Sequence, residues 1–260
     1  MTLINVTIPV LNEQRILADS IGKLMLFLDA RFRYPTEVLV VDNGSIDGTC
    51  CIAQGLSSNY KGLRVLSLKE RGRGRALKRA WSESAAEIFC YMDVDLSTDL
   101  VYFHTLVEAL VTGMADLAVG SRLLNPTLTK RGLKRELISR FYNRLVKAFF
   151  KTKFSDAQCG FKGITREAAK TLLPLVGDTG WFFDTELLVL AEKLGYRIYD
   201  FPVRWTNDPD SRVKIVRTAL EDFKGLIRVR RNLNKGLYPA TAYRKLPSEI
   251  EAKIPKSLSQ

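Results

Sequence analysis

The sequence predicts an α/β fold in which a mixed, mostly parallel sheet is flanked by helices. Short β-branched and apolar runs alternate with longer segments that repeat apolar residues every three or four positions. The connections between them are short, as is typical of parallel strands joined by crossover helices. A chain of 260 residues is also long enough to bury the core of one large domain.

Each element rests on its own stretch of sequence. β-branched and apolar residues predict strands over residues 3–10, 37–41, 63–68, 88–92 and 117–120. Apolar periodicity predicts helices over residues 16–32, from 49 onward, from 75 to 86 and over 99–110. Two further amphipathic helices are expected at residues 131–153 and 214–233.

The charge balance and the cysteines narrow the range of partners. Forty Lys and Arg residues against 28 Asp and Glu residues give a net charge of +12, which indicates nucleic acid, lipid headgroups or a phosphorylated substrate. The four cysteines form no C-x-x-C pair, so reduced thiols of a cytosolic protein are expected. No basic segment precedes the first apolar run, and the longest uncharged run has 13 residues, so neither a signal peptide nor a membrane span is predicted.

One apolar run, residues 88–92, is followed by two carboxylates separated by one residue, Asp93 and Asp95. Side chains alternate in an extended segment, so both carboxylates would point the same way and could bind one divalent cation, Mg²⁺ or Mn²⁺. Such an ion could hold the diphosphate of a nucleotide and stabilise the leaving group. The alternative is an acidic turn that caps a helix beginning near Asp99.

Three other polar loops are expected at the same edge of the sheet. Glu13, Asp42 and residues 71–75 each follow a predicted strand, and ligands bind such sheets at the carboxyl ends of the strands. The glycines and arginines of residues 71–75 would let backbone amides and charge approach a phosphate. Each loop also has a structural interpretation, because Glu13 suits a helix start, Asp42 suits a turn and residues 71–75 suit a flexible basic turn.

Taken together, three motifs resemble the family 2 inverting glycosyltransferases of GT-A fold. They are VTIPVLNE at residues 6–13, VVDNGSIDGT at residues 40–49 and DVD at residues 93–95. In the second half, residues 156–163, 181–188 and 202–205 are similar to the branch that glycosylates polyprenyl phosphates, which includes dolichyl-phosphate glucosyltransferases and dolichol-phosphate mannose synthases. The resemblance covers most of the chain.

With this resemblance as a guide, we predict a role for each matching residue. The predicted nucleotide-sugar-binding residues are Pro9, Asn12, Glu13, Asp42, Arg71, Gly74 and Asp93. The predicted catalytic residues are Asp95, Asp156, Arg122 and Arg212, and the predicted metal ligands are Asp93 and Asp95. The predicted acceptor-binding residues are Arg122, Gln158, Asp184, Ser211 and Arg212.

Some of these residues have structural alternatives. Arg122 could instead pair with a carboxylate at the end of its strand, and Asp156 could pair with Lys162 or a nearby arginine. Arg212 stands where relatives usually carry lysine, and Asn43 stands where the family usually has a second acidic residue. The first change weakens the assignment of Arg212, because arginine and lysine are not interchangeable.

The two amphipathic helices predict contact with an anionic membrane surface. Between Thr129 and Lys153 an apolar face is accompanied by nine basic residues and one acidic residue, and residues 214–233 repeat this combination. Each basic side chain near an anionic leaflet contributes about 1 kcal/mol, so the protein would be held peripherally at the cytoplasmic face. The alternative is that both apolar faces pack on the sheet and the arginines are solvated.

These features predict a metal-dependent, inverting transfer of a hexose from a nucleotide sugar, of the UDP-glucose or GDP-mannose type, to a polyprenyl or dolichyl phosphate. Phosphate is already a nucleophile, whereas a glycan or protein hydroxyl would need Asp184 or Glu186 as a base. A nucleic-acid-binding module is the alternative from another class, but no nucleic acid is expected because no recognition helix or RNA-binding motif is present.

A single domain is expected over residues 1–237. Within it, we expect a nucleotide-sugar half at residues 1–120, an acceptor half at 121–210 and a basic amphipathic helix at 211–237. Residues 238–260 are expected to form a polar tail.

Overall fold

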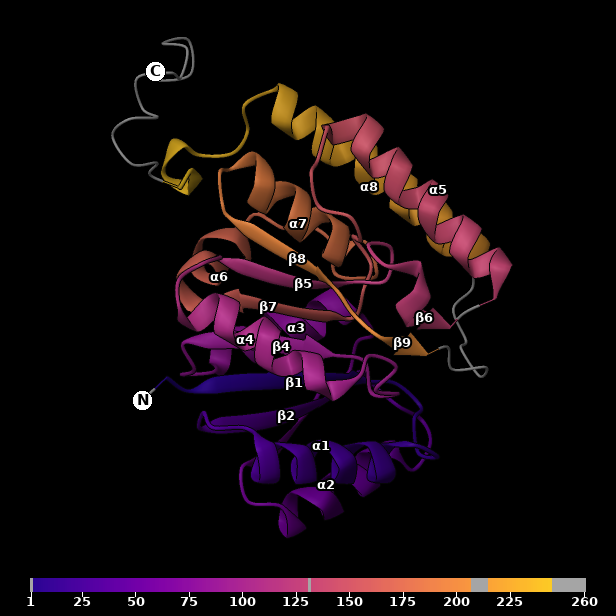
Figure 1. Ribbon diagram of the computed structural model, residues 1–260, viewed down its shortest axis with the longest axis vertical. Helices are drawn as coiled ribbons and strands as arrows, with labels where there is room; N and C mark the ends of the chain where they lie inside the picture. Colours follow the sequence, from indigo (N-terminus) through magenta and orange to yellow (C-terminus); the bar gives the residue numbers. More distant parts are fainter. Residues whose placement is uncertain (1, 131, 207–214, 245–260) are drawn as a thin grey trace.

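The computed structural model describes residues 2–130, 132–206 and 215–244 and shows a seven-stranded sheet between helices (Figure 1). The strands of this sheet follow the order β3-β2-β1-β4-β7-β5-β8. They are β1 (Ile4–Val10), β2 (Thr36–Asp42), β3 (Leu63–Ser67), β4 (Ile88–Met92), β5 (Leu117–Ser121), β7 (Phe161–Thr165) and β8 (Ile198–Pro202). A separate pair joins β6 (Thr129–Lys130) in parallel to β9 (Trp205–Thr206).

Helices cover both faces of the sheet and form two buried clusters with it. The α-helices are α1 (Leu17–Arg31), α2 (Thr49–Asn59), α3 (Arg73–Glu83), α4 (Phe103–Val111), α5 (Leu133–Phe150), α6 (Arg166–Leu172), α7 (Phe183–Lys193) and α8 (Ile215–Asn234). Side chains of α1, α2 and α4 pack on one face, and those of α3 and α5 to α8 pack on the other.

The predicted mixed, mostly parallel sheet is confirmed. β1 runs parallel to β2 and β4, β2 runs parallel to β3, and β5 runs parallel to β8. β7 is antiparallel to both of its neighbours, β4 and β5. Neither its direction nor its place follows from its own residues, because a buried apolar strand has the same pattern in both directions.

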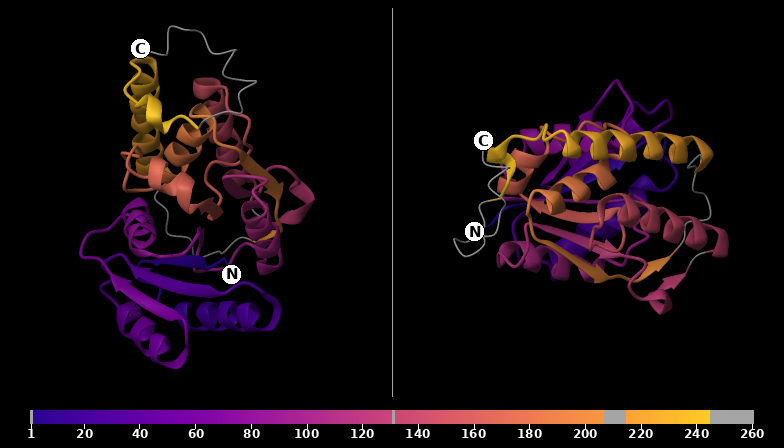
Figure 2. Two further views of the ribbon diagram at one scale, coloured as in Figure 1. Left: turned by 90° about the vertical axis from the view of Figure 1, so that its left-hand side faces the viewer. Right: turned by 90° about the horizontal axis from the view of Figure 1, so that it is seen from above.

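Helices α5 and α8 lie side by side at the end of the molecule beyond β8, and α7 packs beneath them (Figures 1 and 2). The ring centroid of Phe149 in α5 is 6.1 Å from that of Phe223 in α8. Each helix buries one apolar face, to which α5 contributes Val146 and α8 contributes Leu226. Of the helices in the described residues, none has the length and apolar character needed to cross a membrane.

After α8 the chain folds back toward α7. Tyr238 and Ala242 are buried in the core, and the amide of Arg244 donates a hydrogen bond to the carbonyl of Leu194 at 2.9 Å. The first residues of the predicted polar tail therefore pack on the domain. Residues 245–260 lie outside the described residues.

Candidate active site

The carboxyl ends of β1, β2 and β4 meet at one edge of the sheet. The parallel register places Val10 of β1 beside Asp42 of β2, and Thr7 of β1 beside Tyr91 of β4. Asp93 follows two residues after Tyr91, close to the level at which β1 ends. The loops that carry Asp42 and Asp93 therefore share one edge of the sheet, where ligands of such folds bind.

The loops after β1 and β2 are joined by hydrogen bonds. The Asn12 amide donates to Ser45 Oγ at 2.9 Å, and Asn12 Oδ1 accepts from the Ile46 amide at 2.8 Å. The Glu13 amide donates to Thr49 Oγ1 at 2.8 Å. Asn12 has a φ of 57°, a left-handed conformation that asparagine adopts more readily than most residues. Asn12 and Glu13 therefore lie in a hydrogen-bonded corner between β1 and α2.

Asp42 and Pro9 lie on the neighbouring strands at this edge. Asp42 is only 3% exposed, and its Oδ1 accepts from the Ser45 amide at 3.1 Å. This is the turn contact that the sequence around Asp42 also allows. Pro9 is partly exposed and lies beside Val41 of β2. Asp42 thus stabilises its own turn, and its predicted role in binding a nucleotide would be additional to this.

The expectation that Asp93 and Asp95 lie in an extended segment is wrong. β4 ends at Met92, and the carbonyl of Asp93 accepts from the Leu96 amide at 3.1 Å, which closes a turn. Asp95 Oδ1 accepts from the Ser97 amide at 3.0 Å. Leu96 has a φ of 48°, in a region that bulky residues avoid and that often accompanies functional sites. A turn, and not strand alternation, presents the two carboxylates.

Arg73, the first residue of α3, forms an ion pair with Asp93. Its guanidinium is also 3.7 Å from a carboxylate oxygen of Asp184, and it lies over the rings of Trp181 and Tyr91 at 4.5 and 5.4 Å from their centroids. The Arg73 side chain is only 11% exposed. The positive charge that faces Asp93 is therefore held from several sides, and a divalent ion bound by Asp93 would compete with it.

The backbone amides at the start of α3 are already hydrogen-bonded. The Gly74 amide donates to the Gly180 carbonyl at 3.2 Å, and the Arg75 amide donates to the Thr179 carbonyl at 3.0 Å. The prediction that amides of residues 71–75 approach a phosphate therefore does not hold for these two. Amides in the first turn of a helix have no partner within the helix, and here carbonyl groups of the loop before α7 accept their hydrogen bonds.

Gly74 and Arg71, the two residues predicted from this loop, have different surroundings. Gly74 is buried, and a Cβ placed on it would lie 2.6 Å from Cβ of Phe183. The absence of a side chain therefore lets α3 approach α7 closely. Arg71 is exposed at the surface of the loop.

Arg122, the residue after β5, forms a bidentate pair with Asp156. Nε and Nη2 of Arg122 lie 2.7 and 2.9 Å from the two carboxylate oxygens. Burial alone would raise the pKa of Asp156, but the charge and hydrogen bonds of Arg122 outweigh it and lower that pKa to about 2. Both side chains are therefore charged at neutral pH. From the sequence, one alternative for Asp156 was an ion pair with a nearby arginine, and Arg122 is that arginine.

Asp184 lies beneath the site in a buried polar network. It is 1% exposed, and its Oδ1 accepts from Lys162 Nζ at 2.9 Å and from the hydroxyl of Tyr91. Lys162 Nζ also donates to the carbonyl of Cys159 at 2.6 Å. The network ties β4, β7 and α7 together, and the charge of Asp184 is balanced by that of Lys162.

Glu186, two residues further along α7, is also fully buried. Its two carboxylate oxygens lie 2.6 and 2.8 Å from the guanidinium of Arg228 in α8, and one of them accepts from the Asp178 amide at 2.8 Å. Neither Glu186 nor Asp184 is therefore placed or free to accept a proton from a bound hydroxyl.

Gln158 faces α8. Its Nε2 donates to Oδ2 of Asp222 at 2.9 Å, and its amide donates to Oδ1 of Asp156 at 3.2 Å. Two other predicted acceptor residues, Ser211 and Arg212, lie outside the described residues.

A comparison with family models decides the class of protein. Residues 5–173 match the model described as "Glycosyl transferase family 2". The chain belongs to this family. It is therefore a glycosyltransferase, and the resemblance noted from its motifs is confirmed.

Curated relatives of this family 2 chain include a glycosyltransferase named AglD and several dolichyl-phosphate beta-glucosyltransferases. Glycosyltransferase AglD of Haloferax volcanii is 36% identical over 84% of this chain, and the match spans 35% of AglD itself. Dolichyl-phosphate beta-glucosyltransferases are 31% identical in Drosophila melanogaster and 30% identical in Homo sapiens. These matches cover 81% and 94% of this chain, and 69% and 79% of the two relatives.

Solved structures confirm the GT-A fold of this family 2 chain. Glucosyl-3-phosphoglycerate synthase of Mycobacterium tuberculosis, in complex with Mn²⁺, UDP-glucose and phosphoglyceric acid, has a TM-score of 0.67 at 20% identity. The superposition covers 88% of this chain and 80% of the synthase. The same enzyme in complex with Mg²⁺ and UDP has a TM-score of 0.62 at 20% identity, over 88% of this chain and 78% of the synthase.

The carboxylates after β4 of this glycosyltransferase suit a divalent ion completed by its substrate. Mg²⁺ usually keeps several waters and takes one or two carboxylates together with substrate phosphates. Asp93 and Asp95 supply two carboxylates, and the side chain of Asp93 is 37% exposed. Within residues 2–130, 132–206 and 215–244, no three His, Cys, Asp or Glu side chains cluster as a metal cage would require. Two carboxylates are the number that such an ion takes from a protein when substrate phosphates complete its coordination.

Three residues of the site were not singled out from the sequence. Arg73 was only part of a basic loop, Tyr91 was only part of an apolar strand, and Asp222 was only part of an amphipathic helix. Arg73 is the one that a signal could have found, because a guanidinium at the start of a helix after β3 must lie at the same edge as Asp93.

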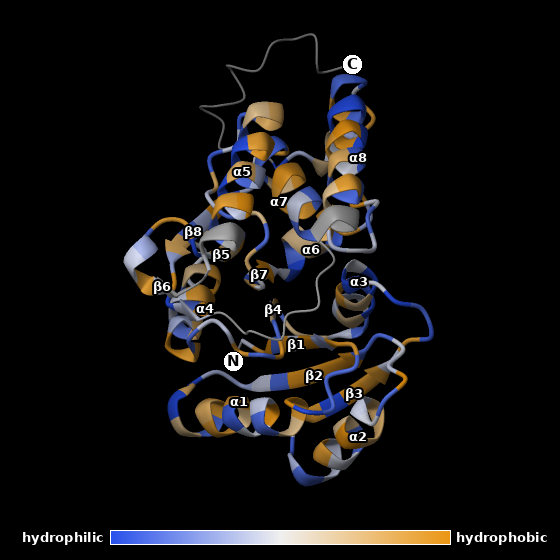
Figure 3. Cartoon of the chain, turned by 90° about the vertical axis from the view of Figure 1, so that its right-hand side faces the viewer, coloured by the Kyte–Doolittle hydropathy of each residue, from blue (hydrophilic) through white to orange (hydrophobic). Residues whose placement is uncertain are grey.

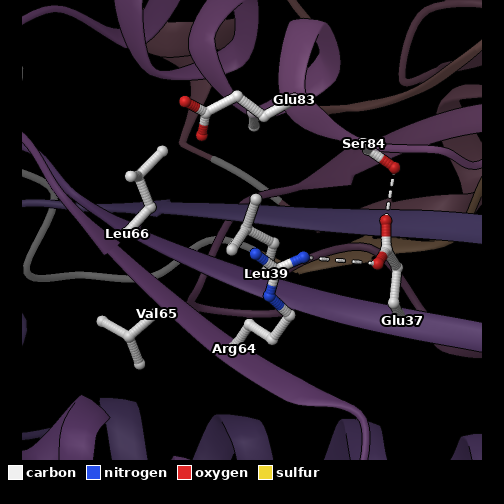
Figure 4. Close-up of a pocket in the computed structure, with 8 residues that line it drawn as sticks. Glu37, Leu39, Arg64, Val65, Leu66, Glu83 and Ser84 are labelled. Atoms are coloured by element: carbon white, nitrogen blue, oxygen red, sulfur yellow. Dashed lines mark hydrogen bonds and ion pairs between the residues drawn. The ribbon is translucent and has the colours of Figure 1, made fainter.

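Two cavities lie away from this site. One of about 40 Å³ lies between β2, β3 and α3 and is lined by Glu37, Arg64 and Ser84 among others (Figure 4). It has space for roughly one water molecule, so it is too small for a nucleotide. A shallow cavity of about 290 Å³ is lined by Trp81 and Phe89 near the opposite end of β4.

Proposed function

We propose that this glycosyltransferase moves a hexose from a nucleotide sugar to a polyprenyl phosphate of the dolichyl phosphate type, at a membrane surface. The names of its relatives support this acceptor, since several are called dolichyl-phosphate beta-glucosyltransferase. UDP-glucose is the first donor to test, because a fold neighbour was solved with it. GDP-mannose is the second.

The observation that carries the proposal is the state of the two carboxylates on α7. A hydroxyl acceptor needs a base, and Asp184 and Glu186 were the candidates for that role. Both are buried and paired with cations, Asp184 with Lys162 and Glu186 with Arg228. A phosphate monoester is already an anion at pH 7 and needs no base, so this arrangement favours a phosphate acceptor.

The proposed reaction is an in-line displacement. A phosphate oxygen of the acceptor attacks the anomeric carbon of the donor, the bond from that carbon to the nucleoside diphosphate breaks, and the configuration inverts. Asp93 and Asp95 would hold a divalent ion, which would stabilise the charge on the departing diphosphate. Arg73 and Arg122 would bring two anionic substrates together, so catalysis would be positioning and charge neutralisation.

The membrane part of the proposal is supported by α5 and α8. Each helix exposes three large apolar side chains: Leu137, Ile138 and Phe141 on α5, and Leu220, Phe223 and Ile227 on α8. The colouring of Figure 3 shows apolar and polar residues interleaved along both helices. Exposed basic residues accompany the apolar ones: Arg144, Lys147, Lys151, Lys224, Arg230, Arg231 and Lys235. Exposed apolar groups beside cations suit an anionic bilayer.

The proposed reaction can be tested with purified protein. We would incubate it with Mg²⁺ or Mn²⁺, a polyprenyl phosphate and each of several labelled UDP- and GDP-sugars, and measure label in the lipid-soluble product. The proposal expects one donor to label the lipid and Asp95→Asn to reduce the rate at least about 100-fold. A wild-type rate in Asp95→Asn would refute the assignment of the metal. Absence of lipid product with every donor would refute the acceptor.

A further inference from the structure

Helix α8 contributes a buried carboxyl group to the interior of the protein. Asp222 is 3% exposed, and its Oδ2 accepts from Gln158 Nε2 at 2.9 Å. Its Oδ1 is buried and has no hydrogen-bond partner. An unsatisfied carboxylate oxygen in such a position is costly, so Asp222 is either neutral or held there for a function.

A chain of hydrogen bonds leads from Asp222 to the candidate acceptor site. Gln158 connects Asp222 on α8 to Asp156, because its side chain donates to the first and its backbone amide donates to the second. Asp156 in turn holds Arg122 through two hydrogen bonds. Helix α8, which exposes apolar and basic side chains on its outer face, is thus linked on its inner face to the cations of the site.

We propose that Asp222 is a positioning residue for the acceptor: it holds the side-chain amide of Gln158, and its ionisation places a negative charge behind Gln158 that weakens binding of the anionic acceptor. This inference rests on the proposed function, in which the acceptor is a phosphate. Asp222 itself does not need to touch the substrate. It acts through Gln158, whose side chain is partly exposed.

The surroundings of Asp222 favour its neutral form. Burial raises the pKa of Asp222 to about 7, which outweighs the opposite effect of the hydrogen bond from Gln158. The charged groups that act on it are also acidic: Asp178 before α7, Asp184 on α7 and Glu221 on α8 itself. Tyr142 of α5 interacts with the same carboxyl.

Because the pKa of Asp222 is raised, the binding of the acceptor should depend on pH. Below pH 7 most molecules carry Asp222 with its proton, and the acceptor meets a neutral group behind Gln158. Above pH 7 the proton is lost and a buried negative charge appears close to the site of an anionic ligand. The KM for the acceptor should therefore rise as the pH increases from 6 to 8, while the KM for the donor changes little.

The test compares Asp222→Asn, Asp222→Ala and wild-type protein, with Asp29→Asn, the same change at an exposed residue of α1, as the control. Asparagine keeps an acceptor for Gln158 and cannot ionise, so Asp222→Asn should have the wild-type acceptor KM at pH 6 and no rise up to pH 8. Asp222→Ala should raise the acceptor KM about five-fold at pH 6, as loss of one hydrogen bond predicts. Asp29→Asn should follow wild type.

Each outcome separates this inference from the proposed function. Lipid product from wild type, together with a wild-type pH profile in Asp222→Asn, would overturn the inference alone. Equal changes in donor and acceptor KM would overturn it too, because a purely structural role predicts them. No product from wild-type protein would overturn the proposed acceptor and the inference with it. If Asp222→Ala does not fold, the pH profile of Asp222→Asn decides.

Discussion

Single residues show how the site balances its charges. The carboxylates of Asp93, Asp156, Asp184 and Glu186 each pair with a cation from another element. These pairs explain why the site can hold acidic groups close together without mutual repulsion. They also separate the carboxylate that is partly open to a ligand, Asp93, from those that are enclosed.

Arg73 leads to a prediction about the metal. In Arg73→Ala the carboxylate of Asp93 loses its competing cation, so Mn²⁺ should bind more tightly in the absence of donor. We expect the Kd for Mn²⁺ to fall by about ten- to 150-fold, the worth of one charged hydrogen bond. Titration calorimetry measures this Kd, and Arg71→Ala, an exposed arginine of the same loop, is the control. An unchanged Kd in Arg73→Ala would show that Asp93 does not bind the ion.

Arg122 leads to a prediction about stability. Arg122→Ala leaves the buried carboxylate of Asp156 without its partner, which should lower the free energy of unfolding by about 3 to 5 kcal/mol. Arg204→Ala removes a pair with Asp99 whose arginine is 60% exposed, and should cost less than about 1 kcal/mol. Urea denaturation of the two variants measures both values. Similar costs would contradict the buried-pair account.

The same pair has a pH signature. The pKa of Asp156 is lowered to about 2 by Arg122 against the effect of burial. Its stabilisation is therefore complete above the unfolded-state pKa near 4 and is lost as the pH falls toward 2. Between pH 4 and pH 2, the free energy of unfolding should therefore fall less in Arg122→Ala than in the wild-type protein.

Much of the residue-level site could be predicted because loop position follows from sheet topology. Glu13, Asp42 and Asp93 had to meet at one edge once the strands were parallel. The edge that Arg73 shares with Asp93 also follows from topology. Contacts between distant parts of the chain could not be predicted in this way. Gln158 meets Asp222 only because α8 packs at a particular angle, which no local pattern encodes.

At the scale of elements, the packing of α3 against α7 tests the structure directly. Gly74→Ala would place a methyl group in contact with Phe183, and such overpacking typically costs about 1 to 3 kcal/mol. Gly55→Ala, within α2, meets nothing within 4 Å and should stabilise the protein by about 0.5 to 1 kcal/mol. Thermal unfolding distinguishes the two. A stabilised Gly74→Ala would mean that α3 and α7 are farther apart.

Helices α5 and α8 lead to a prediction about membranes. Phe141→Asp and Leu220→Asp place a charge among exposed apolar residues and should each reduce cosedimentation with vesicles that contain anionic lipid. Leu26→Asp alters an exposed leucine of α1, 71% exposed and at the opposite end of the molecule (Figure 1), and should bind vesicles as wild type does. Equal loss in all three variants would indicate a nonspecific effect. No loss in any would contradict the proposed surface.

The helices also show the limit of sequence patterns. An amphipathic stripe predicts that one face is covered, but it does not say by what. On α5 and α8, Val146 and Leu226 pack in the core, as the second interpretation expects, while Phe141 and Leu220 remain exposed. Similarly, strand alternation misplaced Asp93 and Asp95, because β4 ends before them in a turn through Leu96.

At the scale of the whole molecule, the sheet has two halves, to which the proposed function gives different tasks. Its amino-terminal half supplies the loops of the predicted donor site, and the elements from β5 onward supply Arg122, Asp156 and the outer helices. β7 joins the halves, since it is hydrogen-bonded to β4 on one side and β5 on the other. The net charge of +12 suits the proposed function, in which the protein attracts an anionic donor, an anionic acceptor and an anionic surface.

The proposed acceptor is a phosphate, because the carboxylates Asp184 and Glu186, which could activate a hydroxyl, are buried and paired. The most direct measurement offers the protein a polyprenyl phosphate and the polyprenol of the same chain length, with the same labelled nucleotide sugar. We predict that label enters the lipid fraction only with the phosphate. Labelling of the polyprenol at a comparable rate would contradict the account.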